Sequence, residues 1–141
     1  MYHQFFSYDP RTNADLTLDI AKAIDGEYSA IACYKQLENL APTQKEKIRI
    51  REIRKDEIKH YQAFTNIFTQ LTGHQHTPKI KEQCPTIYTN GLESAFNDEQ
   101  ETVDFYLDIA DRTNNQYIKD QFKRAAMDEQ NHAVWFLYFL K

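Results

Sequence analysis

The sequence predicts an all-α protein, a four-helix bundle made of two antiparallel hairpins joined by one long crossover. Apolar residues recur every three or four positions in four separate blocks, the pattern of helices with one buried stripe. Gly and Pro number only three and four in 141 residues, and charged residues make up 27% of the chain. That balance is typical of long solvated helices and disfavours a β-sandwich or barrel. A stretch of roughly sixteen residues without usable periodicity separates the second block from the third.

The first two blocks are expected to form one hairpin. The first helix covers about residues 13–39, and residues 1–12 are interpreted as an N-terminal tail. The second helix begins at Thr43, where Thr43 and Glu46 make a capping box, and it ends at Gly73, a natural left-handed terminator. The short link between the two blocks implies that the helices run antiparallel.

The crossover and the second hairpin follow. Residues 74–89 hold two prolines and read as a connection. Extended at about 3.3 Å per residue, it reaches roughly 50 Å, enough to return along a whole helix. The third helix covers about residues 91–113, and the fourth is opened by Asn114 or Asn115. The inner face of the third helix is expected at Asp98, Glu101, Phe105 and Ile109.

Composition excludes several classes of protein. The length fits one domain, residues 1–141, large enough to bury a core without disulfides. The net charge of −4 offers no basic face for nucleic acid. No secretory signal opens the chain, and the longest apolar run, residues 133–140, is too short to span a bilayer. We therefore expect a soluble cytoplasmic protein without nucleic-acid or membrane partners.

The cysteines and the C-terminal aromatic residues support two further expectations. Cys33 and Cys84 have no C-x-x-C spacing, so a reducing compartment fits and a thiolate metal site does not. Cys33 is interpreted as a small core hydrophobe. The tail VWFLYFL is apolar on all sides, so one side is expected to pack inside the bundle and the other against a second copy in a homodimer.

Acidic residues occupy stripe positions where the period demands Leu or Ile. Isolated buried carboxylates would cost many kcal/mol or take up protons, so they need positive partners. No Lys or Arg shares these positions, whereas two histidines do. Four carboxylates and two neutral imidazoles carry −4, which two divalent metal ions cancel. The six candidate ligands are Glu27, Glu57, His60, Glu101, Glu129 and His132.

The motif D-E-x-x-H occurs twice, as residues 56–60 and 128–132. A Glu and a His three residues apart share one face of a helix and can hold one ion together. Glu27 precedes Glu57 by 30 residues and Glu101 precedes Glu129 by 28, so the chain looks like one hairpin used twice. A pseudo-twofold axis between the hairpins would bring all six side chains around one point.

The aspartate of each motif is rotated about 100° from the glutamate, towards a neighbouring helix. We expect Asp56 to accept the free ring N–H of His132, and Asp128 that of His60, so that both imidazoles are held in one orientation. A single E-x-x-H is usually a solvated surface pair. Two copies in register, inside apolar stripes and with two further glutamates, favour metal.

Glu, E-x-x-H, Glu, E-x-x-H resembles the ferritin-like di-iron carboxylate superfamily, and most closely the rubrerythrins, over residues 18–140. The resemblance implies two iron ions, with manganese or zinc as substitutes. It implies that His60 and His132 each bind one iron, that Glu57 and Glu129 bridge the ions or bind beside them, and that Glu27 and Glu101 are terminal ligands. Which glutamates bridge stays open.

Two departures from the rubrerythrin pattern matter. Rubrerythrins carry a further glutamate one turn before the third-helix ligand, tied to a ligand swap; Asp98 stands there, a shorter candidate ligand, which puts the swap in doubt. The four cysteines of a rubredoxin domain are also missing from these 141 residues. Electrons would have to come from a separate donor protein or from Fe(II) itself.

The resemblance leaves several functions open. The first is a di-iron oxidoreductase that reacts with hydrogen peroxide or dioxygen, as a peroxidase or a ferroxidase. The alternatives are an iron-binding or structural bundle without sustained catalysis, and a di-iron hydroxylase. Tyr34 and Tyr106 are candidates for a redox role or for hydrogen bonds to ligands, with core packing as the alternative. His74 and His76 are interpreted as residues of a solvated loop.

Overall fold

The computed structural model describes residues 10–141, with side chains from Asp15 onwards. This part of the chain forms four α-helices, which are α1 (Pro10–Leu40), α2 (Gln44–Thr72), α3 (Tyr88–Arg112) and α4 (Gln116–Leu140). Residues 1–9 of the predicted tail lie outside the described residues, and residues 10–12 already belong to α1.

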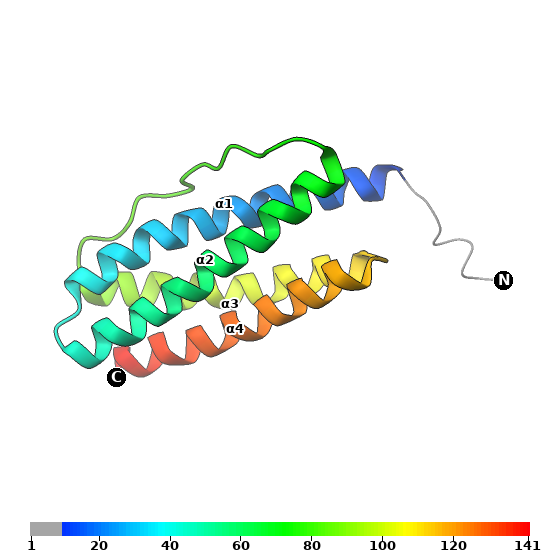
Figure 1. The fold of residues 1–141 in the computed structure, drawn as a ribbon. Coiled ribbons are helices and arrows are strands. Elements are labelled where there is room, and N and C mark those ends of the chain that lie inside the picture. The colour runs from blue at the N-terminus through cyan, green and yellow to red at the C-terminus, as the bar shows by residue number, and fades with distance from the viewer. Residues whose placement is uncertain (1–9) are drawn as a thin grey trace.

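The helices pack as two antiparallel hairpins, α1 with α2 and α3 with α4 (Figure 1). Between the hairpins, residues 73–87 run back along the bundle beside α1 before α3 begins (Figure 1). The predicted fold class is therefore confirmed. None of the described helices is long and apolar enough to cross a membrane.

The predicted caps of α2 and α4 are present. The Thr43 hydroxyl accepts from the Glu46 backbone N–H at 3.2 Å and donates to the Glu46 carboxylate at 2.6 Å, the two bonds of that capping box. Gly73 ends α2 with φ 73°, and its N–H donates to the Thr69 carbonyl at 2.8 Å. Asn115 opens α4 by accepting from the Ile118 N–H at 3.0 Å.

The start of α3 lies three residues before the predicted one, at Tyr88. Gly91 is therefore inside the helix, where Leu37 of α1 packs against it. A Cβ built on Gly91 would lie 2.6 Å from Leu37 Cδ1, so the glycine allows a close approach of α1 and α3. The sequence analysis read this glycine as a helix boundary because packing between distant helices leaves no local signal.

The core consists of two apolar clusters with a buried polar layer between them. One cluster is centred on Phe64 and Phe122, whose stacked rings lie 4.1 Å apart between centroids. The other contains Tyr34, Leu37 and Phe136. Along the helices, the buried glutamates and histidines fall between residues of the first cluster and residues of the second. The polar layer is thus walled by apolar packing at both ends.

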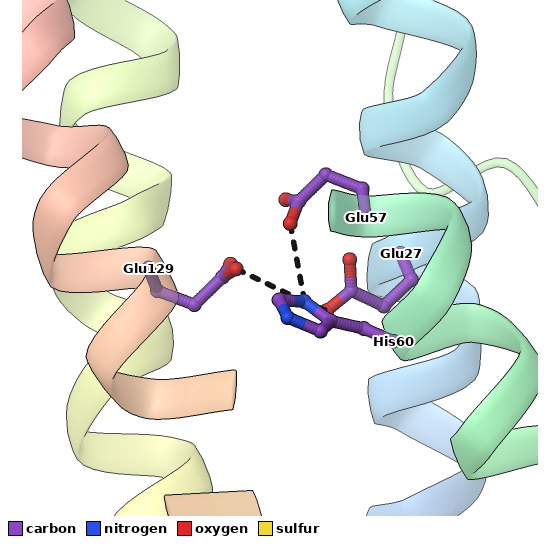
Figure 2. Close-up of side chains that lie close together, drawn as sticks. All are labelled: Glu27, Glu57, His60 and Glu129. Atoms are coloured by element: carbon purple, nitrogen blue, oxygen red, sulfur yellow. Dashed lines mark hydrogen bonds and ion pairs between the residues drawn. The ribbon is translucent and has the colours of Figure 1, made fainter. Parts of the chain in front are cut away.

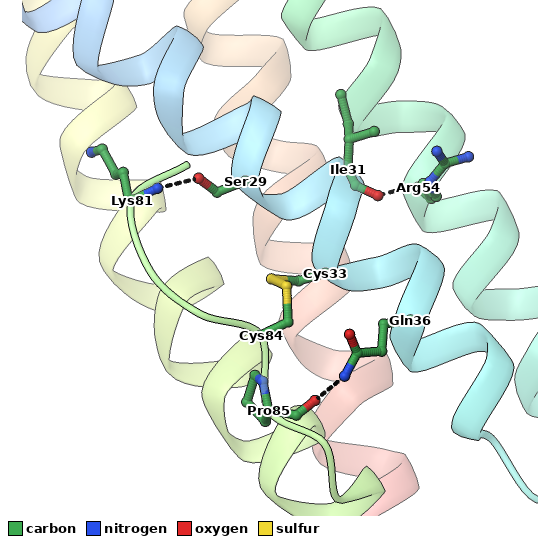
Figure 3. The surroundings of a disulfide bond; sticks show 8 residues. All are labelled: Ser29, Ile31, Cys33, Gln36, Arg54, Lys81, Cys84 and Pro85. Atoms are coloured by element: carbon green, nitrogen blue, oxygen red, sulfur yellow. Dashed lines mark hydrogen bonds between the residues drawn. A yellow bond between two sulfur atoms is a disulfide. The ribbon is translucent and has the colours of Figure 1, made fainter. Parts of the chain in front are cut away.

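Cys33 and Cys84 form a disulfide, with 5.2 Å between their Cα atoms (Figure 3). The expectations that Cys33 is a free core hydrophobe and that disulfides are absent are therefore wrong. The two residues are 51 positions apart and meet only because the crossover returns over α1. The inference of a reducing compartment, which assumed unpaired cysteines, loses its basis.

Hydrogen bonds also attach the crossover to α1. The Lys81 N–H donates to the Ser29 hydroxyl at 2.8 Å, and the Gln36 amide donates to the Pro85 carbonyl at 2.7 Å (Figure 3). His76 is half buried and its Nε2 lies 2.8 Å from an Asp25 carboxylate oxygen. The expectation of a solvated loop therefore fails at this histidine, although His74 is exposed as expected.

The C-terminal aromatic segment has the two-sided character that its sequence predicts. Phe136 is fully buried in the core, whereas Val134, Leu137 and Tyr138 are each at least half exposed. A second copy of the chain as the cover of this outer side stays a prediction.

Replacing Gly73 by Ala should lower the free energy of unfolding by about 1 kcal/mol, because an L side chain is strained in the left-handed region. The matched control is Gly26→Ala inside α1, where nothing lies within 4 Å of the added Cβ. That variant should raise the free energy of unfolding by about 0.5–1 kcal/mol. Urea unfolding followed by circular dichroism measures both; equal effects would contradict the assignment of Gly73 as the terminator.

Candidate metal centre

Six buried side chains from all four helices meet in the polar layer. They form two groups whose potential ligand atoms lie within 4.8 Å of one another. Glu57 and Glu129 belong to both groups, so the groups overlap as the ligands of two neighbouring metal ions do. The first group is Glu27, Glu57, His60 and Glu129 (Figure 2), and the second is Glu57, Glu99, Glu129 and His132.

Helical geometry brings these residues together. Glu57 and His60 lie three residues apart on the buried face of α2, and Glu129 and His132 repeat this on α4. The remaining glutamate of each group comes from the other helix of the same hairpin, α1 or α3. Figure 2 shows the imidazole of His60 turned towards Glu57 and Glu129.

The α3 ligand is Glu99, which corrects the expectation of Glu101. Glu99 is 2% exposed and belongs to the second group, whereas Glu101 lies on the exposed side of α3. The buried face of α3 runs through Leu92, Ala95, Glu99, Tyr106 and Ile109. The predicted face at Asp98, Glu101 and Phe105 was rotated from it, because α3 holds several acids in succession and its period alone does not single one out.

A sequence signal for Glu99 was present in the repeat. Glu99 precedes Glu129 by 30 residues, the same separation as between Glu27 and Glu57. The first-hairpin positions 27, 57 and 60 and the second-hairpin positions 99, 129 and 132 differ by 72 throughout. Requiring equal spacing in both hairpins, rather than accepting 28 beside 30, selects Glu99 and rejects Glu101.

Each histidine ring connects the polar layer to an aspartate on the facing hairpin. Nδ1 of His60 points into the layer, 3.2 Å from oxygens of Glu27 and Glu57 and 3.3 Å from one of Glu129. The opposite ring nitrogen, Nε2, donates to Asp128 at 2.8 Å. Nδ1 therefore remains as the ring nitrogen available to a metal ion.

The second histidine has the same arrangement. Nδ1 of His132 lies 2.8 Å from Glu99 Oε2, and its Nε2 donates to Asp56 at 2.8 Å. The two cross-hairpin contacts expected from the sequence, Asp56 with His132 and Asp128 with His60, are therefore present. Because each aspartate fixes one ring nitrogen as a donor, both rings keep one orientation.

The two buried tyrosines are hydrogen-bonded to the outer glutamates. The Tyr106 hydroxyl donates to Glu27 at 2.5 Å, and the Tyr34 hydroxyl donates to Glu99 at 2.9 Å. Burial first, and then the nearby carboxylates, raise the pKa of both tyrosines well above 10. Both phenols therefore stay protonated, and each orients one carboxylate from the opposite hairpin.

Without metal the cluster must hold protons. Burial, and then repulsion from the neighbouring carboxylates, raises the pKa of Glu57 and Glu129 well above the usual range. Burial lowers the pKa of His132, but hydrogen bonds to Asp56 and Glu99 outweigh it and raise that pKa to about 10. Metal ions bind ligands that have lost these protons, so binding and deprotonation are coupled.

The donor set fits two metal ions. Neither oxygen of Glu57 has a hydrogen-bond partner, and one oxygen each of Glu27 and Glu129 also lacks one. Buried polar atoms are normally satisfied, so oxygens without partners in a layer of carboxylates and imidazoles indicate ligands. A cavity of about 290 Å³ reaches the same layer between α1 and α3 and touches Glu27, Glu57, Glu99 and Glu129.

Asp98, the further candidate ligand, lies outside both ligand groups. Much of the residue is exposed, and it lines the cavity beside Glu82 and Glu101. Partial burial and the neighbouring carboxyl of Glu82 raise the pKa of Asp98 to about 7. Its counterpart in the first hairpin, 72 positions earlier, is Gly26, so the hairpin repeat does not extend to this position.

Known proteins match both this fold and this site. The Rubrerythrin family model matches residues 90–141, the segment of α3 and α4. The uncharacterized protein YhjR of Bacillus subtilis (strain 168) is 48% identical over 142 residues, which cover 99% of this chain and 98% of YhjR. A hypothetical protein from Pyrococcus furiosus has the same fold, with a TM-score of 0.78 at 19% identity over 89% of this chain and 87% of that chain.

The bundle, the overlapping carboxylate and histidine groups and these matches define a ferritin-like bundle with a candidate di-metal centre. The chain belongs to the rubrerythrin family and resembles YhjR over nearly its whole length. The resemblance read from the sequence is thereby confirmed. Since the family match covers the second hairpin, the ligands of the first hairpin rest on the structure and on the 72-residue repeat.

Exchanging the two α3 glutamates for glutamine, one at a time, tests the corrected ligand. Glu99→Gln should bind less metal per chain than the wild type, because one carboxylate of the second group is lost. The matched control Glu101→Gln should bind as much as the wild type. Metal analysis after saturation with Fe(II) and desalting measures both; the reverse ranking would restore Glu101 as the ligand.

Asp56→Asn should weaken metal binding by about 10- to 100-fold, because an amide accepts the His132 N–H less strongly than a carboxylate. Asp104→Asn, at an exposed position of α3, is the control and should change nothing. Competition with a chelator of known affinity measures the effect. Equal affinity of both variants would show that Asp56 does not support the centre.

Proposed function

We propose that the protein is a non-haem di-iron oxidoreductase that reacts with hydrogen peroxide or dioxygen. The observation that carries this proposal is the pair of overlapping buried ligand groups, each with one imidazole and three carboxylates. Bound iron would supply electron exchange between Fe(II) and Fe(III), which the four carboxylates balance in charge. The expected reactions are peroxide reduction with an electron donor and oxidation of ferrous iron.

Ligand chemistry favours iron over other metals. Oxygen-rich ligation with one imidazole nitrogen per ion suits iron or manganese, whereas structural zinc sites are usually tetrahedral and rich in thiolates. The cysteines of this chain are paired with each other, away from the ligand groups. Manganese and zinc remain substitutes that the same ligands can bind.

The chain's own residues would prepare the centre for an oxidant. Tyr106 and Tyr34 hold Glu27 and Glu99 by hydrogen bonds, so these carboxylates keep their place when charge changes. The cavity of about 290 Å³ gives a small molecule access to the carboxylates. That volume is at the lower end of the range of about 300–1,000 Å³ for pockets of drug-sized ligands, which favours peroxide or dioxygen over an organic substrate to be hydroxylated.

Iron-supplemented expression tests the centre directly. The wild type should contain about two iron ions per chain, the stoichiometry of a di-iron bundle, and show the absorption of an oxo-bridged ferric pair. Glu57→Ala should lose both, because Glu57 belongs to both ligand groups. Glu52→Ala, at an exposed position of the same helix, is the control and should keep both.

Turnover decides between catalysis and iron binding alone. The iron-loaded wild type should consume hydrogen peroxide steadily with an added electron donor, and Glu57→Ala should not. Iron that is bound but gives no turnover with peroxide, dioxygen or Fe(II) would support the alternative, a bundle that holds iron without sustained catalysis. Absence of iron from the wild type would reject both readings.

A further inference from the structure

The disulfide lies at the border between the candidate centre and solvent. Cys33 lines the same cavity as the four carboxylate ligands. Cys33 and Cys84 are each half buried, so the bond is also within reach of molecules outside the bundle. A disulfide placed only to staple the fold needs no position in the wall of a reactive cavity.

Helix geometry connects Cys33 closely to the ligands. Cys33 follows Glu27 by six residues on α1, a rise of about 9 Å along the helix axis. Its neighbour Tyr34 donates a hydrogen bond to Glu99. The sulfur pair and the ligand layer are therefore joined by one helix and open into one cavity.

The hydrogen bonds of the crossover would keep the two cysteines together after reduction. Lys81 is bonded to Ser29 and Pro85 to Gln36, on either side of Cys84 along the crossover (Figure 3). Breaking the S–S bond therefore leaves the crossover attached to α1. The two thiols stay adjacent and can close again, as a reversible redox pair requires.

We propose that Cys33 and Cys84 are a redox-active pair that supplies electrons for peroxide reduction at the centre; this rests on the proposed function. The two thiols lose two electrons and two protons, and the S–S bond forms. Hydrogen peroxide gains both, its O–O bond breaks, and two water molecules leave. A dithiol donor from outside then reduces the disulfide by thiol–disulfide exchange and is itself oxidised to a disulfide.

Thiol counting tests the pair independently of turnover. Full-length protein is loaded with Fe(II), reduced with dithiothreitol, desalted without oxygen and titrated with hydrogen peroxide. Free thiols are counted with a chromogenic disulfide reagent, and the intact mass reports the bond. Both thiols should disappear, and the protein should consume about one more equivalent of peroxide than Cys33→Ser/Cys84→Ser, the equivalent that two thiols reduce.

Two comparisons can overturn the proposal. Metal-free protein should lose its thiols much more slowly than the loaded protein; equal rates would mean that peroxide attacks the sulfurs without the centre. Gln36→Ala removes an anchor of the crossover but keeps both sulfurs, so its thiols should still be oxidised. Thiols that survive in the loaded wild type while peroxide is consumed would also reject the pair.

The same titration separates this proposal from the one it rests on. If the loaded wild type consumes peroxide with a small-molecule electron donor while both thiols stay reduced, the pair is rejected and the oxidoreductase stands. If no donor supports peroxide consumption, the oxidoreductase fails, and with it the pair.

Discussion

The structure depends on the burial of four carboxylates in the middle of a helical bundle. In an apolar interior one isolated carboxylate already costs several kcal/mol, and four together repel one another. Protons or metal ions must compensate this charge, and the two histidines, held by Asp56 and Asp128, offer one nitrogen each for the second choice. The apolar clusters on both sides keep water away, so the compensation has to come from inside.

Approximate twofold symmetry makes this arrangement possible with few kinds of contact. The two hairpins repeat one pattern with an offset of 72 residues, and each hairpin orients the ligands of the other. Tyr34 on α1 holds Glu99 on α3, and Tyr106 on α3 holds Glu27 on α1. Because the contacts cross between the hairpins, neither hairpin can complete the centre alone.

Much of the fold and of the site follows from local patterns. The stripes predicted four helices, the capping box and Gly73 predicted the ends of α2, and E-x-x-H predicted two ligand pairs and their aspartate supports. The register of α3 did not follow, because acids on successive positions blur the period. Only comparison with the first hairpin selects Glu99. The disulfide and the role of Gly91 depend on contacts between distant segments, for which the sequence of one chain holds no local signal.

The position of the cavity makes the centre chemically one-sided. Its lining includes the four carboxylates and both tyrosines, whereas His60 and His132 are absent from it and face α2 and α4. An incoming molecule therefore meets oxygen donors and a negative potential before anything else. The entrance works as an electrostatic sieve: it admits neutral molecules such as hydrogen peroxide and dioxygen and opposes anions such as superoxide.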